Sequence, residues 1–317
     1  MSSKPVIAVI GGIGAQGTSV IQALAEGNKY TVLGLTRSAS QPNVAELAKL
    51  PNVKIVEGSC FDEPTLFKVF EEAEYAYVNT NGPVIGQRNE TYWGIRKLGD
   101  YNKQFRCGHT DGKGRVADFI KSQPTTPMKW TIHATVPYIE LLFNFFGPRR
   151  YHETPDVFSF TSPMGDVQVP LIYLDDIGRY ARWVFDHPER SSGMDLQVSS
   201  LNTTWDNIAK VFTDVTGQKA EHKRLTIEEF IDLYPGTDKL LGKDFDPHDP
   251  TLLPMKQNYS GMLTMLASGK VLDLINYELL DEILPHRLRS LDDWMRRTVY
   301  TGEYKQVIKQ DWSLGGK

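Results

Sequence analysis

The first eighty residues alternate between short apolar runs and helical apolar patterns. Residues 6–10 (VIAVI) form a continuous apolar run, which is typical of a parallel strand buried on both faces. Apolar runs of the same kind predict further strands at 30–35, 53–56 and 76–78. Between the strands, one-sided apolar patterns predict helices around 20–24, 44–50 and 64–72. Strands alternating with helices favour a doubly wound parallel sheet with right-handed crossovers.

Beyond residue 80 the pattern becomes mixed. Helices are predicted at 84–98, 109–123, 139–146, 176–185, 203–216, 226–233, 259–274 and 285–299, strands at 130–135, 157–160 and 167–174, and a Gly-, Asp- and Pro-rich loop at 235–254. We therefore predict an α/β protein with a Rossmann-type domain at 1–136. A smaller C-terminal α/β lobe at 137–317, interleaved with the first domain, would cover its cleft and meet a substrate or partner.

Charge and composition exclude several functional classes. The chain has 317 residues, with 35 Lys and Arg against 39 Asp and Glu, so it lacks the basic excess of a direct nucleic-acid binder. Two cysteines cannot build a disulfide framework, and the seven histidines lack the spacing of metal ligands. The most apolar stretch, 138–147, is too short to span a bilayer. We expect no metal and no membrane contact, and a location in the cytoplasm with the nucleus as a second compartment.

A glycine-rich segment follows the first strand and opens a helix. We call residues 11–17 the glycine loop; it satisfies both G-x-G-x-x-G and G-x-x-G-x-x-G and consists of Gly11, Gly12, Ile13, Gly14, Ala15, Gln16 and Gly17. Such glycines permit a tight turn and a close approach of a pyrophosphate to the backbone. The following helix start offers N–H groups to the anion. The loop predicts a dinucleotide site, and the alternative is an ordinary glycine-rich turn.

The end of the second strand indicates which dinucleotide binds. The chain reads Thr36-Arg37-Ser38 there, with no acidic residue. NAD sites commonly place an acid at this point for the ribose 2′-hydroxyl, whereas a cation suits the 2′-phosphate of NADP. We therefore predict NADP(H), with Arg37 on the 2′-phosphate and the two hydroxyls as added donors. The alternative for Arg37 is a solvated surface residue.

Several later motifs carry a family resemblance. They are Asn79-Thr80-Asn81-Gly82, Tyr92-Trp93-Gly94-Ile95-Arg96, the run 106–116 (RCGHTDGKGRV), Pro137-Tyr138-Ile139-Glu140, Asp176-Ile177-Gly178 and the stretch 204–209. With the glycine loop, they resemble the NmrA-like family, an atypical branch of the short-chain dehydrogenase/reductases common in fungi. The run 106–116 makes the resemblance specific, and it extends over 6–298.

The resemblance also implies roles for individual residues. Asn79, Thr80 and Asn81 would lie beside the nicotinamide; the alternative is a polar strand end without a ligand. Redox-active relatives use Tyr-x-x-x-Lys, and the same spacing here is His109-x-x-x-Lys113. Lys113 would hold the ribose and His109 would exchange the proton, since imidazole titrates near neutral pH. Tyr138 is a reserve donor. The alternatives are a His109 without a catalytic task and a Tyr138 that only covers the core.

A short connection departs from the family pattern. Only nine residues, 97–105, separate two motifs between which relatives carry a helix end, a fifth strand and a loop. Either strand 130–135 takes the vacated place in the sheet, or the chain is a truncated product. The first functional hypothesis is an NADPH-dependent oxidoreductase acting on a small apolar carbonyl or enone, in specialised metabolism. The second is a redox-sensing regulator that binds NADP and a transcription-factor partner, and the third is a cofactor-independent isomerase or cyclase.

Overall fold

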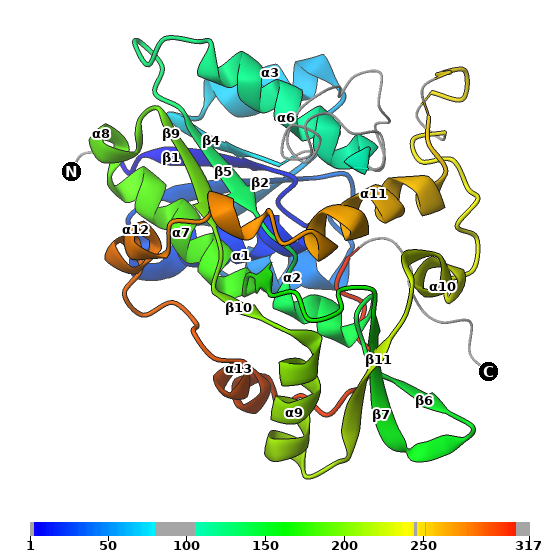
Figure 1. Cartoon of the computed structure of the whole chain (residues 1–317). Helices are drawn as coiled ribbons and strands as arrows, with labels where there is room; N and C mark the ends of the chain where they lie inside the picture. Colours follow the sequence, from blue (N-terminus) through cyan, green and yellow to red (C-terminus); the bar gives the residue numbers. More distant parts are fainter. Residues whose placement is uncertain (1–2, 80–104, 244–245, 251, 309–317) are drawn as a thin grey trace. The chain divides into compact units, whose positions relative to one another are not determined.

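A computed structural model describes residues 3–79, 105–243, 246–250 and 252–308 (Figure 1). By its internal contacts the chain divides into two compact units. The first unit joins 1–80 to 173–194, and the second joins 81–172 to 195–317. The first unit differs from the predicted domain at 1–136, because it includes 173–194 and does not include 81–136.

A parallel sheet forms the centre of the first unit. Its strands are β1 (Val6–Ile10), β2 (Thr31–Thr36), β3 (Val53–Glu57) and β4 (Tyr75–Val78), in the order β3-β2-β1-β4. Ala8 of β1 pairs with Leu33 on one side and Ala76 on the other, both in parallel register. The side chains of Ile7, Ala8 and Val9 are fully buried. The predicted parallel α/β sheet is therefore confirmed, and the four predicted strands are all present.

Six helical segments belong to the first unit. They are α1 (Ala15–Ala25), η1 (Glu26–Asn28), α2 (Pro42–Ala48), α3 (Glu63–Glu71), α7 (Leu174–Asp186) and α8 (Pro188–Ser191). Helix α7 lies against α1 (Figure 1). A Cβ on Gly178 would lie 2.2 Å from the carbonyl oxygen of Ser19, so glycine allows the two helices to approach closely. This contact brings α7 back to the sheet from far along the chain.

Strand β4 carries an exposed apolar face. Ala76 is exposed, and Val78 is 58% exposed although it pairs with the buried Ile10. Phe67 of α3, the helix that precedes β4 in the chain, is 67% exposed. Among the described residues the sheet ends at β4. Of the short connection 97–105, only Phe105 belongs to the described residues.

The second unit contains many shorter elements. They are α6 (Gly108–Lys121), β5 (Thr131–Thr135), η3 (Ile139–Phe143), β6 (Arg149–Tyr151), β7 (Thr154–Ser162), β8 (Val169–Leu171), β9 (Met194–Val198), β10 (Leu201–Thr203), α9 (Trp205–Thr216), β11 (Ala220–Arg224), α10 (Ile227–Asp232), α11 (Met255–Ala267), η4 (Leu272–Leu274), α12 (Tyr277–Ile283) and α13 (Leu291–Thr298). They form small sheets in the orders β11-β7-β6, β10-β8 and β5-β9. Buried aromatic rings fill the core, with Phe146 packed edge-on against Trp205.

Three predicted helices differ from those observed. The helix predicted at 139–146 is a 3-10 helix that stops at Phe143, because Asn144 leaves helical geometry and its side chain accepts from the N–H of Phe145. The helix predicted at 259–274 ends at Ala267, and a left-handed Gly269 follows. Only 291–298 of the predicted 285–299 is helical, since Ser290 caps the helix start. The helix predicted at 84–98 lies outside the described residues.

Candidate functional site

The glycine loop makes a tight turn where β1 ends. Gly11 has a φ of +77°, and a Cβ there would lie 2.4 Å from the carbonyl oxygen of Asn79. A Cβ on Gly17 would lie 2.3 Å from the carbonyl oxygen of Gly11. Any side chain at either position would collide with backbone. The turn therefore forms a cradle that only a bare backbone can line.

Helix α1 begins in this cradle without a side-chain cap. Its N-cap residue is Gly14, which makes no side-chain cap hydrogen bond, and no acidic residue lies in its first turn. A helix start is normally stabilised by a capping side chain or an acid, because its first N–H groups have no partner within the helix and the positive end of the helix dipole lies there. Their absence leaves this end of the eleven-residue helix suited to an anionic ligand.

The end of β4 is tied to the glycine loop. The N–H of Asn79 donates to the carbonyl of Ile10 at 3.2 Å, and the Tyr77 hydroxyl donates to Oε1 of the buried Gln16 at 3.4 Å. Asn79 therefore lies at the carboxyl end of β4 next to Gly11, where ligands of such sheets bind. Its contact with nicotinamide stays a prediction, and Thr80 and Asn81 lie outside the described residues.

We call residues 37–41, between β2 and α2, the arginine loop. Arg37 is exposed, and among the described residues its side chain has no hydrogen bond or ion pair. The buried Thr36 hydroxyl donates to the carbonyl of Ser38 at 3.0 Å and accepts from the Ser38 N–H at 3.2 Å. Thr36 therefore shapes the turn. The Ser38 hydroxyl lies 2.9 Å from that of Ser40.

The arginine loop is connected to the glycine loop through α2. Asn43 in the first turn of α2 donates from Nδ2 to the carbonyl of Ile13 at 3.3 Å. Neither Asn43 nor Ser40 was predicted from the sequence. The signal for Ser40 was its place two residues after Ser38, which becomes informative only once the turn is known.

The predicted acid-base residues belong to the second unit. His109 and Lys113 are four residues apart near the start of α6, and the side chain of His109 lies outside the described part of the structure. Lys113 is exposed, and the half-buried Tyr138 precedes η3 and bridges to Ile172. Their catalytic roles stay predictions.

Two further ionisable groups of the second unit are not activated for catalysis. Burial raises the pKa of the Cys107 thiol to about 12, so it is not a thiolate near neutral pH. Burial lowers the pKa of His133 to about 4, so this imidazole is neutral under the same conditions. Neither group has the charge state of an activated nucleophile or of a proton donor.

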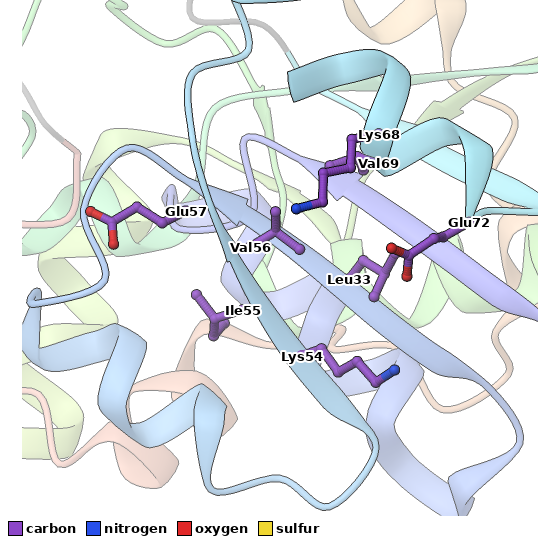
Figure 2. A pocket seen from close by; sticks show the side chains of 8 residues that line it. All are labelled: Leu33, Lys54, Ile55, Val56, Glu57, Lys68, Val69 and Glu72. Atoms are coloured by element: carbon purple, nitrogen blue, oxygen red, sulfur yellow. The ribbon is translucent and has the colours of Figure 1, made fainter. Parts of the chain in front are cut away.

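A hollow of about 360 Å³ lies beside β3 and α3 (Figure 2). Figure 2 shows Lys68 of α3 above Val56 of β3, and Glu72, next to the end of α3, above Lys54. Its charged groups are two lysines and two glutamates, and it contains none of the predicted site residues. It therefore lies apart from the glycine loop.

Comparison with known proteins identifies related sequences. The NmrA-like family pattern matches residues 3–96 and 99–241. An NmrA-like family domain-containing protein of Dictyostelium discoideum is 24% identical over 288 residues, covering 82% of this chain and 89% of its own length. The NmrA-like oxidoreductase malD of Malbranchea aurantiaca is 25% identical over 261 residues, covering 71% and 76%.

Solved structures share the fold. NmrA, described as a negative transcriptional regulator in complex with NADP, superposes with a TM-score of 0.61 at 14% identity, over 93% of this chain and 95% of its own. An NADPH-dependent quinone oxidoreductase of Escherichia coli gives a TM-score of 0.62 at 13% identity, over 93% of this chain and 100% of its own.

In the part of the chain that the structure describes, no helix combines the length and apolarity needed to cross a bilayer.

Proposed function

The chain belongs to the NmrA-like family, and from that premise we propose that it is an NADPH-dependent oxidoreductase. Its substrate would be a small, largely apolar carbonyl or enone. Curated relatives from several fungi are named as oxidoreductases, which favours catalysis over a purely structural use of the fold.

The geometry of the glycine loop supports the cofactor part of this proposal. Gly11 and Gly17 leave no room for a Cβ, and α1 begins there without a cap or an acid. These features fit a pyrophosphate, which needs close backbone approach and N–H donors. Arg37 at the end of β2 fits the 2′-phosphate. Among the described residues its guanidinium has no hydrogen bond or ion pair, so it can bind this anion, and its loop contains no acid that would repel the phosphate.

Lys113 and His109 would perform the remaining chemistry. When bound, NADPH supplies a hydride to the electrophilic carbon of the substrate. Lys113 would orient the cofactor ribose. His109 would then donate a proton to the atom that receives the displaced electron pair, with Tyr138 as the reserve donor. A histidine is suited to this task near neutral pH.

Steady-state oxidation of NADPH tests the activity. We expect turnover with at least one of 2-cyclohexenone, a naphthoquinone, an aromatic aldehyde and a cyclic imine. His109→Phe should lower kcat about 100-fold, which is the lower end for loss of a general acid, while the Kd for NADPH stays unchanged. Tyr138→Phe is the matched variant for the reserve donor. No NADPH consumption with any of these compounds would contradict the oxidoreductase.

A redox-sensing regulator is the second candidate function. The observation that favours it is His109 in place of the tyrosine of Tyr-x-x-x-Lys, since loss of the usual proton donor suits a protein that binds NADP without turnover. Such a sensor must bind NADPH and NADP⁺ with different affinities in different states. Equal affinities for the two forms in the presence and absence of a partner would exclude it.

A further inference from the structure

Two serine hydroxyls lie together in the arginine loop. Oγ of the half-buried Ser38 is 2.9 Å from Oγ of the exposed Ser40. Arg37 precedes them and, among the described residues, has no acceptor for its guanidinium. The loop therefore presents one cation and two hydroxyls over four residues, with no acid from Thr36 to Gln41.

Thr36 is occupied by the turn itself. Its hydroxyl donates its single proton to the Ser38 carbonyl and accepts from the Ser38 N–H. A hydroxyl has one donor, so Thr36 could bind a ligand oxygen only by giving up the bond that shapes the turn. Among the described residues, the hydroxyls of Ser38 and Ser40 bond to each other and make no hydrogen bond to the backbone.

The serine pair has unused donor capacity. When one hydroxyl donates to the other, the second still has a proton to give. A tetrahedral dianion offers several acceptor oxygens at once, so both hydroxyls can donate to it and exchange their mutual bond for two charge-assisted ones. A neutral ribose hydroxyl offers one oxygen and no charge, so it gains less from the same pair.

We propose that Ser40 is a specificity-determining residue for NADP(H). Together with Ser38 and Arg37 it binds the 2′-phosphate, and Thr36 is a positioning residue that holds the turn. This inference rests on the proposed function, because it requires a dinucleotide on the glycine loop. It replaces the sequence-based role of Thr36 as a direct donor.

Calorimetric titration of the full chain with 2′,5′-ADP and 5′-AMP isolates the phosphate. The unchanged protein should bind 2′,5′-ADP more tightly than 5′-AMP. Ser40→Ala should weaken 2′,5′-ADP about tenfold, as expected for one hydrogen bond to a charged group, and leave 5′-AMP unchanged. Ser40→Thr keeps the hydroxyl and should retain most of the preference. Thr36→Val should weaken 2′,5′-ADP, and this loss should largely disappear in a Ser38→Ala, Ser40→Ala background.

Two outcomes would overturn the inference. In one, Ser40→Ala binds 2′,5′-ADP as the unchanged protein does. In the other, it weakens both ligands equally, which would mean general damage to the loop. Failure of the proposed function gives a different result, because the unchanged protein would then bind neither NADPH nor NADH.

Discussion

The two ends of helix α1 differ in whether side chains of the protein bond to the backbone groups there. At the C-terminal end, Nη1 of Arg182 donates to the carbonyls of Ala23 and Glu26 at 2.8 and 2.9 Å. Nδ2 of Asn52 donates to the carbonyl of Ala25 at 3.2 Å. At the N-terminal end, the N-cap residue is Gly14, which makes no side-chain cap hydrogen bond. The protein completes one end with its own side chains, and the other end is suited to a ligand.

This difference separates residues that stabilise the fold from residues that bind. Arg182 comes from α7, far along the chain, and its charge complements the negative end of the helix dipole. The glycine loop has the opposite polarity and no protein anion in the first turn. Changes at the C-terminal end should therefore lower the free energy of unfolding, and changes at the N-terminal end should lower nucleotide affinity.

Arg182→Leu should have the largest effect on stability. It removes two hydrogen bonds to α1 carbonyls and an ion pair with Asp186. Charged groups contribute about 1.5–3 kcal/mol per hydrogen bond, so we expect a loss of about 2 kcal/mol after allowance for partial exposure. Urea unfolding measures this loss. Arg179→Leu is the matched control, since its exposed pair with Asp175 should contribute little.

Ala15→Glu should act on the other end of α1 with opposite signs. An acid in the first turn interacts favourably with the helix start and should stabilise the protein by about 0.5 kcal/mol. The same charge would repel a pyrophosphate, so the affinity for both NADPH and NADH should fall about tenfold. Thermal unfolding and calorimetry measure the two effects, with Ala15→Gln as the neutral control. An unchanged affinity would mean that the pyrophosphate binds elsewhere.

Asp186→Asn should lower stability less than Arg182→Leu does, and the effect should depend on pH. Burial opposes ionisation of Asp186, but hydrogen bonds from the Lys29 ammonium and the Tyr30 hydroxyl outweigh it and hold its pKa below the ordinary value. A depressed carboxyl pKa contributes stability above the unfolded pKa of about 3.9. We expect a loss of about 1 kcal/mol at pH 7. The difference from the unchanged protein should shrink as pH falls below about 4; a constant difference would contradict this origin.

Local signals predicted the first unit well. The apolar run of β1 and the spacing of the glycine loop both depend on neighbouring residues. The approach of Gly178 to Ser19 could not be predicted in this way, because the two residues are far apart in sequence and only an internal glycine in α7 hints at it. The arrangement of hydroxyls in the arginine loop also escaped prediction. Thr36 and Ser38 have similar side chains, and only the turn shows which hydroxyl is already used.

In the second unit, hydrogen bonds from side chains to the nearby backbone override the apolar pattern. The predicted helix at 285–299 is shortened because the Ser290 hydroxyl accepts from the Asp293 N–H and starts the helix there. The interrupted helix after Phe143 follows from the geometry of Asn144. Apolar periodicity alone contains neither of these bonds.

Calorimetric titration with NADPH, NADP⁺, NADH and NAD⁺, on the unchanged protein and on Arg37→Ala, tests the central claim most directly. The account predicts that the phosphorylated dinucleotides bind more tightly, and that Arg37→Ala weakens them about 10- to 100-fold, as expected for loss of a charge-assisted contact. The affinities for NADH and NAD⁺ should stay nearly constant. Binding of none of the four, or equal binding of all four that Arg37→Ala leaves unchanged, would contradict an NADP(H) site at the ends of β1 and β2.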